Sequence, residues 1–273
     1  MFTATSLLFV PGSRPDRFAK ARASGAGLVV IDLEDAVGPA DKDDARAAAL
    51  EAAGADPAYG IRINGVATRA GIADLHHLAD ADRLPDAMMV PMVEDAAQLD
   101  VVAGALGDRC PDLMPLVETP RGLRHALAIA SHPKVTAVML GGADFSGELG
   151  VELAWEPLLA ARQQLILACA EARTPAIDAP FAALDDDDGF AEDCRRAQAV
   201  GFAAKSAIHP RQVPIISGIF EPSDELYAEA VAALAAYEEA GEKAIRYKGR
   251  MLEAPLVKNY RAIVARKGDT AHA

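Results

Sequence analysis

Two short apolar runs in the sequence are each followed by a single carboxylate and by residues that are typical of turns. The first run ends at Glu118, just before Thr119-Pro120-Arg121-Gly122, and the second ends at Gly141-Gly142, just before Asp144. A buried strand that stops at an acid presents that acid at the rim of a sheet, and two such acids on successive strands can hold one hard cation. The glycine pair also lets the backbone approach closely. We therefore predict that Glu118 and Asp144 are metal ligands.

Further polar residues follow the other apolar runs, namely Arg14, Glu34, Asp35, Arg62, Asn64, Asp178 and His209. Five carboxylates at one rim would repel one another, and a single arginine supplies too little positive charge to balance them. A divalent cation is the simplest balance. Oxygen ligands with few protein donors favour Mg²⁺, with Mn²⁺ as an alternative.

Each of these residues also has a plainer interpretation. We interpret Asp178 and the acidic run at 185–188 as helix caps or solvated loop residues, a use for which aspartate is well suited. Arg62 either grips a substrate carboxylate bidentately or forms an ion pair with Glu34 or Asp35. His209 is interpreted as structural.

A basic cluster of Arg14, Arg17 and Lys20 follows the first apolar run, near the start of a predicted helix where anions are favoured. It is interpreted either as a site for a phosphate-bearing ligand or as a solvated helix face. Lys205 is the only lysine near a predicted strand end, so an aldolase that forms a Schiff base would depend on it. The sequence provides better for a metal-dependent route.

Eight apolar runs alternate with predicted helices, at 6–10, 28–33, 61–63, 87–90, 113–117, 135–140, 176–177 and 202–208. Continuous apolar strands are typical of a parallel sheet that is covered on both faces. Eight such units predict an α/β fold, a (β/α)8 TIM barrel over residues 1–221, with a doubly wound sheet as the alternative. Residues 222–273 are predicted to form a C-terminal helical extension, a lid or subunit-docking arm, with a loop at 247–255.

The composition limits the partners of the protein. The chain has 273 residues and a formal net charge of −13, which argues against nucleic acid as a partner, because such binding needs a basic field. No apolar run reaches the length of a membrane span. The three cysteines lack CxxC spacing, as expected for reduced thiols in a cytoplasmic protein.

Six motifs occur in a characteristic order, at Leu8–Pro15, Ile31–Val37, Arg62–Asn64, Val117–Thr119, Gly142–Asp144 and Ile208–Pro210. Together they resemble the citrate lyase β-subunit-like family, which includes malyl-CoA and citramalyl-CoA lyases. The resemblance implies a TIM barrel that assembles as a homotrimer or a multiple of it, with Mg²⁺ held by Glu118 and Asp144.

The resemblance also assigns roles to other residues. It implies that Arg62 contacts the substrate carboxylate or the enolate, and that Phe9, Arg14 and Lys20 hold coenzyme A. Asp35 is expected to orient Arg62 or metal-bound water, and Glu118 to lie beside the substrate as well as the metal.

Two positions depart from the family pattern. Relatives carry an aspartate in the C-terminal segment that reaches into a neighbouring subunit as acid or base, whereas this chain has Glu253, whose side chain is one methylene longer. Met92 stands where many relatives have lysine. Glu253 is expected to serve as the catalytic acid or base.

The implied reaction is the Mg²⁺-dependent cleavage of a 3-hydroxyacyl-CoA, such as malyl-CoA, methylmalyl-CoA or citramalyl-CoA. The products would be a 2-oxo acid, such as glyoxylate or pyruvate, and an acyl-CoA; the reverse Claisen condensation uses the same site. The alternatives are a citrate lyase β subunit that acts on a citryl-acyl-carrier protein, a malate-synthase-like thioesterase, and a non-catalytic protein that binds CoA thioesters.

Overall fold

The computed structural model describes residues 2–270 of the chain. The chain divides into two compact units, Met1–Ser217 and Gly218–Ala273. Within the described residues, no helix is both long enough and apolar enough to cross a membrane.

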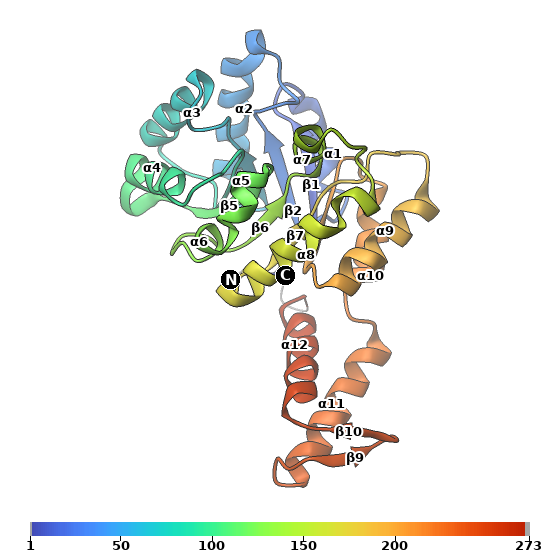
Figure 1. The fold of residues 1–273 in the computed structure, drawn as a ribbon. Helices are drawn as coiled ribbons and strands as arrows, with labels where there is room; N and C mark the ends of the chain where they lie inside the picture. The colour runs from blue at the N-terminus through green and yellow to red at the C-terminus, as the bar shows by residue number, and fades with distance from the viewer. Residues whose placement is uncertain (1, 271–273) are drawn as a thin grey trace. The chain divides into compact units, whose positions relative to one another are not determined.

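The first unit is a closed barrel of eight parallel strands in sequential order (Figure 1). The strands are β1 (Ser6–Pro11), β2 (Leu28–Asp32), β3 (Tyr59–Arg62), β4 (Ala87–Val90), β5 (Asp112–Val117), β6 (Val138–Leu140), β7 (Ala176–Asp178) and β8 (Ala204–Ala207). The barrel closes where β1 pairs with β8, with Ser6 opposite Lys205. This closure confirms the predicted (β/α)8 barrel and excludes the doubly wound sheet.

The strands are buried on both faces, as their continuous apolar runs predict. Val29, Val30 and Ile31 of β2 are fully buried. Apolar side chains fill the inside of the barrel, namely Leu7, Leu28, Val30, Met89, Met114, Leu116, Ala137, Met139, Ile177 and Ala204. The barrel is therefore a packed core, and its chemistry is confined to the rim.

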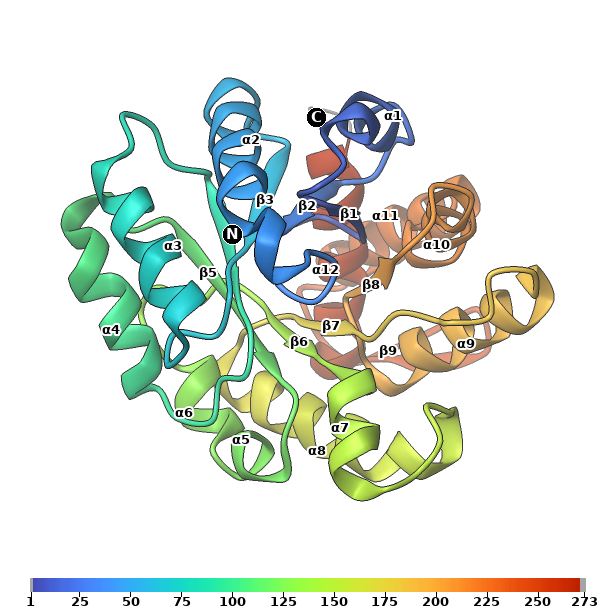
Figure 2. The same cartoon turned by 90° about the horizontal axis from the view of Figure 1, so that it is seen from above.

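Helices connect the strands and surround them (Figure 2). They are α1 (Phe18–Arg22), α2 (Lys42–Ala55), α3 (Arg69–Asp80), α4 (Ala97–Leu106), α5 (Pro120–Arg124), α6 (Ala126–Ala130), α7 (Gly142–Leu149), α8 (Trp155–Ala172), α9 (Asp187–Val200) and α10 (Gln212–Phe220). Three short 3-10 helices complete the connections, η1 (Pro15–Arg17), η2 (Pro39–Asp41) and η3 (Gly107–Arg109).

The second unit contains α11 (Asp224–Glu239), the antiparallel hairpin of β9 (Ile245–Tyr247) and β10 (Arg250–Leu252), and α12 (Ala254–Thr270). Ala233, Tyr237, Leu252 and Val257 form its buried core. The prediction of a loop at 247–255 was therefore wrong in part, because Arg250–Leu252 form the strand β10. Lys248 and Gly249 connect the two strands, both with positive φ (44° and 83°), which is the backbone that a tight two-residue hairpin turn requires.

Candidate active site

The carboxyl ends of the strands surround a cavity of about 410 Å³. Five of the residues selected from the sequence line it, namely Phe9, Asp35, Arg62, Glu118 and Asp144. They come from separate strand ends that the barrel brings to one rim, which is where barrel enzymes place their active sites.

Glu118 and Asp144 form a close pair of carboxyl groups in this cavity. Glu118 directly follows β5 and is only 1% exposed, and its Oε1 accepts a hydrogen bond from the Met92 backbone N–H at 3.1 Å. Asp144 lies in the first turn of α7 and not in a loop. Burial, and then the hydrogen bond that Glu118 shares with Asp144, raise the pKa of Glu118 to about 9. Such a pair of acids is stabilised by a cation.

The backbone beside this pair is shaped around the Glu118 side chain. A Cβ added to Gly141 would lie 2.1 Å from Cγ of Glu118, so only glycine fits there. Among residues 2–270, no three histidine, cysteine, aspartate or glutamate side chains are grouped as a metal site. Two carboxylates without further protein donors fit Mg²⁺, which keeps several of its waters and takes oxygen ligands. The residues present therefore suit this ion.

Arg62, at the end of β3, is held by acids from the end of β2. Its Nε and Nη2 donate to the two carboxylate oxygens of Asp32, each at 2.7 Å. Its Nη1 lies 2.9 Å from Oε2 of Glu34 and 3.8 Å from Oδ2 of Asp35. Of the two interpretations of Arg62, the ion pair with Glu34 or Asp35 is thus present, while the side chain also lines the cavity.

Asp32, the main partner of Arg62, was not among the site residues predicted from the sequence. The sequence does contain a sign of its role, because Asp32 is the one charged residue in β2 and stands at the last position of that strand. Burial opposes the charge of Arg62, but the hydrogen bonds to Asp32 and the negative charges of Asp32, Glu34 and Asp35 together hold the pKa of Arg62 above its ordinary value. Burial also raises the pKa of Glu34 to about 7, although Arg62 opposes this shift.

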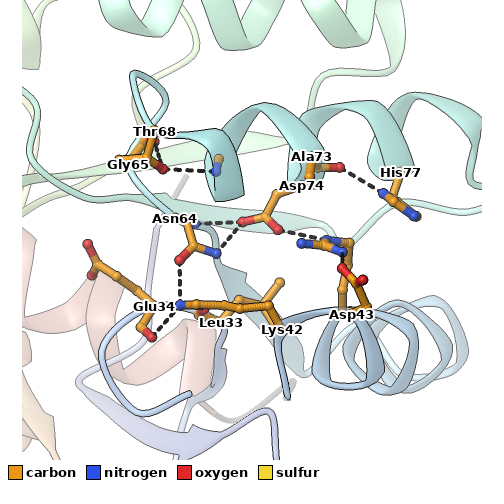
Figure 3. Close-up of polar contacts among 12 residues, drawn as sticks. Leu33, Glu34, Lys42, Asp43, Asn64, Gly65, Thr68, Ala73, Asp74 and His77 are labelled. Atoms are coloured by element: carbon orange, nitrogen blue, oxygen red, sulfur yellow. Dashed lines mark hydrogen bonds and ion pairs between the residues drawn. The ribbon is translucent and has the colours of Figure 1, made fainter. Parts of the chain in front are cut away.

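A polar network fixes the backbone that carries these acids (Figure 3). The Lys42 ammonium donates to the backbone carbonyls of Leu33 and Glu34, each at 2.7 Å, and to Oδ1 of Asn64 at 2.6 Å. Asp74 in turn accepts from Asn64 and from Arg46, which is buried. The turns after β2 and β3 are therefore held against α2 and α3. This fixes the backbone on either side of the Arg62 side chain.

Phe9 lines both the main cavity and a second one of about 450 Å³, as do Val10, Pro11 and Ile208. Arg17 and Lys20 line this second cavity, together with His209. Arg14 does not line it, although Asp16, with which its guanidinium pairs at 2.7 Å, does. The basic cluster predicted from the sequence is thus divided, with two of its three members facing the cavity.

Asp178 is neither a cap nor a loop residue, so that prediction was wrong. It is fully buried at the end of β7 and pairs with Arg162 at 2.9 Å and with Lys205 at 2.6 Å. Burial opposes the charges, but the two cations hold the pKa of Asp178 below its ordinary value, and Asp178 and Asp193 hold that of Lys205 above its own. A buried, protonated lysine is no Schiff-base nucleophile. In the acidic run, Asp186 caps α9 through the Gly189 N–H, as predicted.

Comparison with known proteins identifies the family. The family described as HpcH/HpaI aldolase/citrate lyase matches residues 5–210. The chain belongs to this family. The resemblance inferred from the six motifs is thereby confirmed.

Named members of the HpcH/HpaI aldolase/citrate lyase family are similar over most of the chain. The L-malyl-CoA/β-methylmalyl-CoA lyase of Cereibacter sphaeroides is 34% identical over 94% of this chain and 92% of its own. The (3S)-malyl-CoA thioesterase of the same organism is 35% identical over 86% and 83%. Protein CitE of Mycobacterium tuberculosis, solved in complex with magnesium, acetoacetate and coenzyme A, superposes with a TM-score of 0.83, at 33% identity over 97% and 98% of the two chains.

The two positions that depart from the family pattern lie in different units. Met92 follows β4, and its backbone contacts Glu118. Glu253 is exposed in the second unit, immediately before α12, and its carbonyl accepts from the N–H groups of Leu256 and Val257.

Proposed function

We propose that this member of the HpcH/HpaI aldolase/citrate lyase family is a Mg²⁺-dependent carbon–carbon lyase for a 3-hydroxyacyl-CoA. Malyl-CoA, methylmalyl-CoA and citramalyl-CoA are the substrates of this class, and the products are a 2-oxo acid, such as glyoxylate or pyruvate, and an acyl-CoA. The observation that carries the proposal is the buried Glu118, paired with Asp144 in a cavity that Arg62 also lines. The similarity to the malyl-CoA/β-methylmalyl-CoA lyase supports the substrate class.

Glu118 and Asp144 would hold the Mg²⁺ ion. When bound, Mg²⁺ makes a substrate hydroxyl more acidic and stabilises negative charge on oxygen. Arg62 supplies a fixed positive charge that Asp32 and Glu34 orient. A preorganised cation of this kind stabilises the charge of a thioester enolate as that charge develops. Asp35 is the third carboxylate near the Arg62 guanidinium.

The reaction is a retro-Claisen cleavage of the bond between C2 and C3. Glu253 takes the proton of the C3 hydroxyl, and the C–O bond becomes a carbonyl as the C2–C3 bond breaks. The electron pair of the broken bond passes to C2 and the thioester carbonyl, next to Arg62. The proton taken up by Glu253 is then returned to C2, directly or through water, which gives the acyl-CoA, and the other fragment leaves as the 2-oxo acid. Condensation runs through the same steps in reverse.

The second cavity is the proposed site for the coenzyme A portion. Phe9 supplies an apolar wall to both cavities, and Lys20 and Arg17 supply positive charge for phosphate groups. Arg14 contributes if it exchanges its exposed partner Asp16 for a phosphate, because an exposed ion pair is weak.

The proposed assembly is a homotrimer or a multiple of it, in which Glu253 serves the site of a neighbouring subunit. The helical extension, residues 222–273, would then act as the lid or docking arm. Light scattering coupled to gel filtration measures the mass of the assembly and so the number of subunits. A monomer that is fully active would exclude the shared site.

A second candidate is a thioesterase, favoured by the similarity to the (3S)-malyl-CoA thioesterase. A citrate lyase β subunit is another, because solved relatives carry that name. Purified protein with Mg²⁺ should be tested on malyl-, methylmalyl-, citramalyl- and longer hydroxyacyl-CoA substrates, with 2-oxo acid and free thiol measured together. Release of 2-oxo acid without free thiol supports the lyase, and free thiol without 2-oxo acid supports the thioesterase. Turnover only of a citryl-acyl-carrier protein would support the citrate lyase subunit, and no turnover at all would favour a binding protein.

A further inference from the structure

Met92, the residue that contacts Glu118, has a strained backbone. Its φ is 53°, in the left-handed region that is disfavoured for residues with a side chain. Its N–H nevertheless donates to Oε1 of Glu118 at 3.1 Å. Strain of this kind persists only where the surroundings impose it, so the turn after β4 must be held by other contacts.

The Val93 N–H donates to the Leu116 carbonyl at 3.1 Å, and the Gln98 side chain makes further contacts to this turn from the first turn of α4. Its Oε1 accepts hydrogen bonds from the backbone N–H groups of Glu94, at 2.7 Å, and Asp95, at 3.1 Å. Its Nε2 donates to the backbone carbonyl of Met92 at 3.2 Å. One amide thus joins both ends of the segment from Met92 to Asp95.

We propose that Gln98 is a positioning residue for the metal site. By holding the turn, it keeps the Met92 N–H on Glu118 and so keeps this carboxylate in the orientation in which it meets Asp144. The inference rests on the proposed function, in which Glu118 binds Mg²⁺. Gln98 acts through the backbone and has no contact with substrate assigned to it.

Gln212 provides a matched control at another strand end. Its Oε1 accepts from the backbone N–H groups of Ile208, at 2.9 Å, and His209, at 3.2 Å, and its Nε2 donates to the carbonyl of Phe181 at 3.2 Å. The two bonds to Oε1 therefore hold the turn after β8 as Gln98 holds the turn after β4, while the Nε2 bond ties that turn to the loop after β7. That turn borders the proposed coenzyme A cavity, and although Ile208 also lines the main cavity, the bonds of Gln212 go to Ile208, His209 and Phe181 and not to Met92 or Glu118.

The test measures the affinities for Mg²⁺ and for free coenzyme A by calorimetry, without substrate, for the full chain and for Gln98→Ala and Gln212→Ala. Loss of an outer contact of a metal ligand weakens metal binding by about 10- to 100-fold. We expect a loss toward the lower end of this range, about 10-fold, in Gln98→Ala, because Gln98 reaches Glu118 only through the Met92 backbone, and we expect coenzyme A affinity to be unchanged. Gln212→Ala is expected to show the opposite pattern. Thermal unfolding confirms that each variant is folded.

A rescue experiment separates positioning from a general structural role. Glycine adopts positive φ freely, so adding Met92→Gly to Gln98→Ala is expected to recover about fivefold of the lost Mg²⁺ affinity. Wild-type Mg²⁺ affinity in Gln98→Ala overturns the positioning role and leaves the proposed function intact. Equal losses of both ligands, without rescue, also overturn it. Failure of the wild-type protein to bind Mg²⁺ overturns the proposed function and this inference together.

Discussion

The guanidinium of Arg62 holds the carboxylate of Asp32 through two hydrogen bonds of 2.7 Å each. This bidentate pair joins the ends of two neighbouring strands, which are themselves paired at these residues. The orientation of the arginine is therefore fixed by the sheet, and its remaining nitrogen faces Glu34.

Removal of Asp32 is expected to destabilise the fold as well as the site. Asp32→Ala leaves the largely buried Arg62 without its main partner, and breaking a buried pair in this way lowers the free energy of unfolding by about 3–5 kcal/mol. Urea unfolding measures the change. The control is Asp56→Ala, which breaks the half-exposed pair with Arg22 and is expected to have a much smaller effect. Equal losses in the free energy of unfolding for the two variants would show that the buried Arg62–Asp32 pair stabilises the fold no more than an exposed pair does.

Removal of either proposed metal ligand is expected to abolish Mg²⁺-dependent cleavage and leave the fold intact. Glu118→Ala and Asp144→Ala each take away one of two protein ligands, so Mg²⁺ binding by calorimetry is lost together with turnover. Circular dichroism checks the fold. A variant that stays active without added metal would contradict the metal site.

Glu253→Gln is expected to lower turnover far more than it weakens thioester binding, because the amide cannot accept the hydroxyl proton. Loss of general acid–base catalysis typically costs about 10²- to 10⁴-fold in kcat. Steady-state kinetics and calorimetry with coenzyme A separate the two effects. Unchanged kcat would assign the acid–base role to another group.

The buried Asp178–Lys205 pair predicts a stability that falls at both ends of the pH scale. The pKa of Asp178 is lowered in the folded chain, so its contribution is present above the ordinary pKa of about 3.9 and is lost as pH falls through the folded value. The pKa of Lys205 is raised, so its contribution is present below about 10.4 and is lost as pH rises through the folded value.

Urea unfolding across a pH series measures both effects. Asp178→Asn is expected to be less stable at neutral pH and to lose less further stability in acid than the wild-type protein. Asp185→Asn, at a fully exposed position that pairs with Arg211, is the control and should follow the wild-type curve. Parallel acid limbs for wild type and Asp178→Asn would refute the role of the buried pair.

The positive φ of Met92 predicts that glycine at this position gives a more stable fold than alanine does. Met92→Gly is expected to be more stable than Met92→Ala by about 1 kcal/mol, because alanine keeps the left-handed penalty and glycine does not. Chemical unfolding compares the two variants directly. An alanine variant as stable as the glycine variant would show that the turn relaxes without cost.

The barrel and the pairing of Glu118 with Asp144 followed from the sequence because parallel strands place their carboxyl ends at one rim. Asp32 was missed because only its partner Arg62, 30 residues further along the chain, shows why an acid ends that strand. Asp178 was misassigned for a related reason. Its partners Arg162 and Lys205 come from α8 and β8, and nothing local in the sequence indicates their approach.

The C-terminal unit shows a limit of another kind. The run from Tyr247 to Pro255 has the composition of a loop, yet Lys248 and Gly249 form the turn of a hairpin. The pairing that makes β9 and β10 strands depends on packing against Tyr237 and Val257. The predicted helical extension holds for α11, whose first turn Ser223 caps by accepting from the Leu226 N–H.

The seam between β1 and β8 has a consequence for the biosynthesis of the protein. Phe9 at one side of the seam and Ile208 at the other line both cavities. A nascent chain that has passed Asp144 but not yet Ile208 already carries both proposed metal ligands and still lacks one wall of each cavity. Because the N-terminal part of a domain emerges first, the proposed thioester site is completed late in translation, when the last strand docks beside the first.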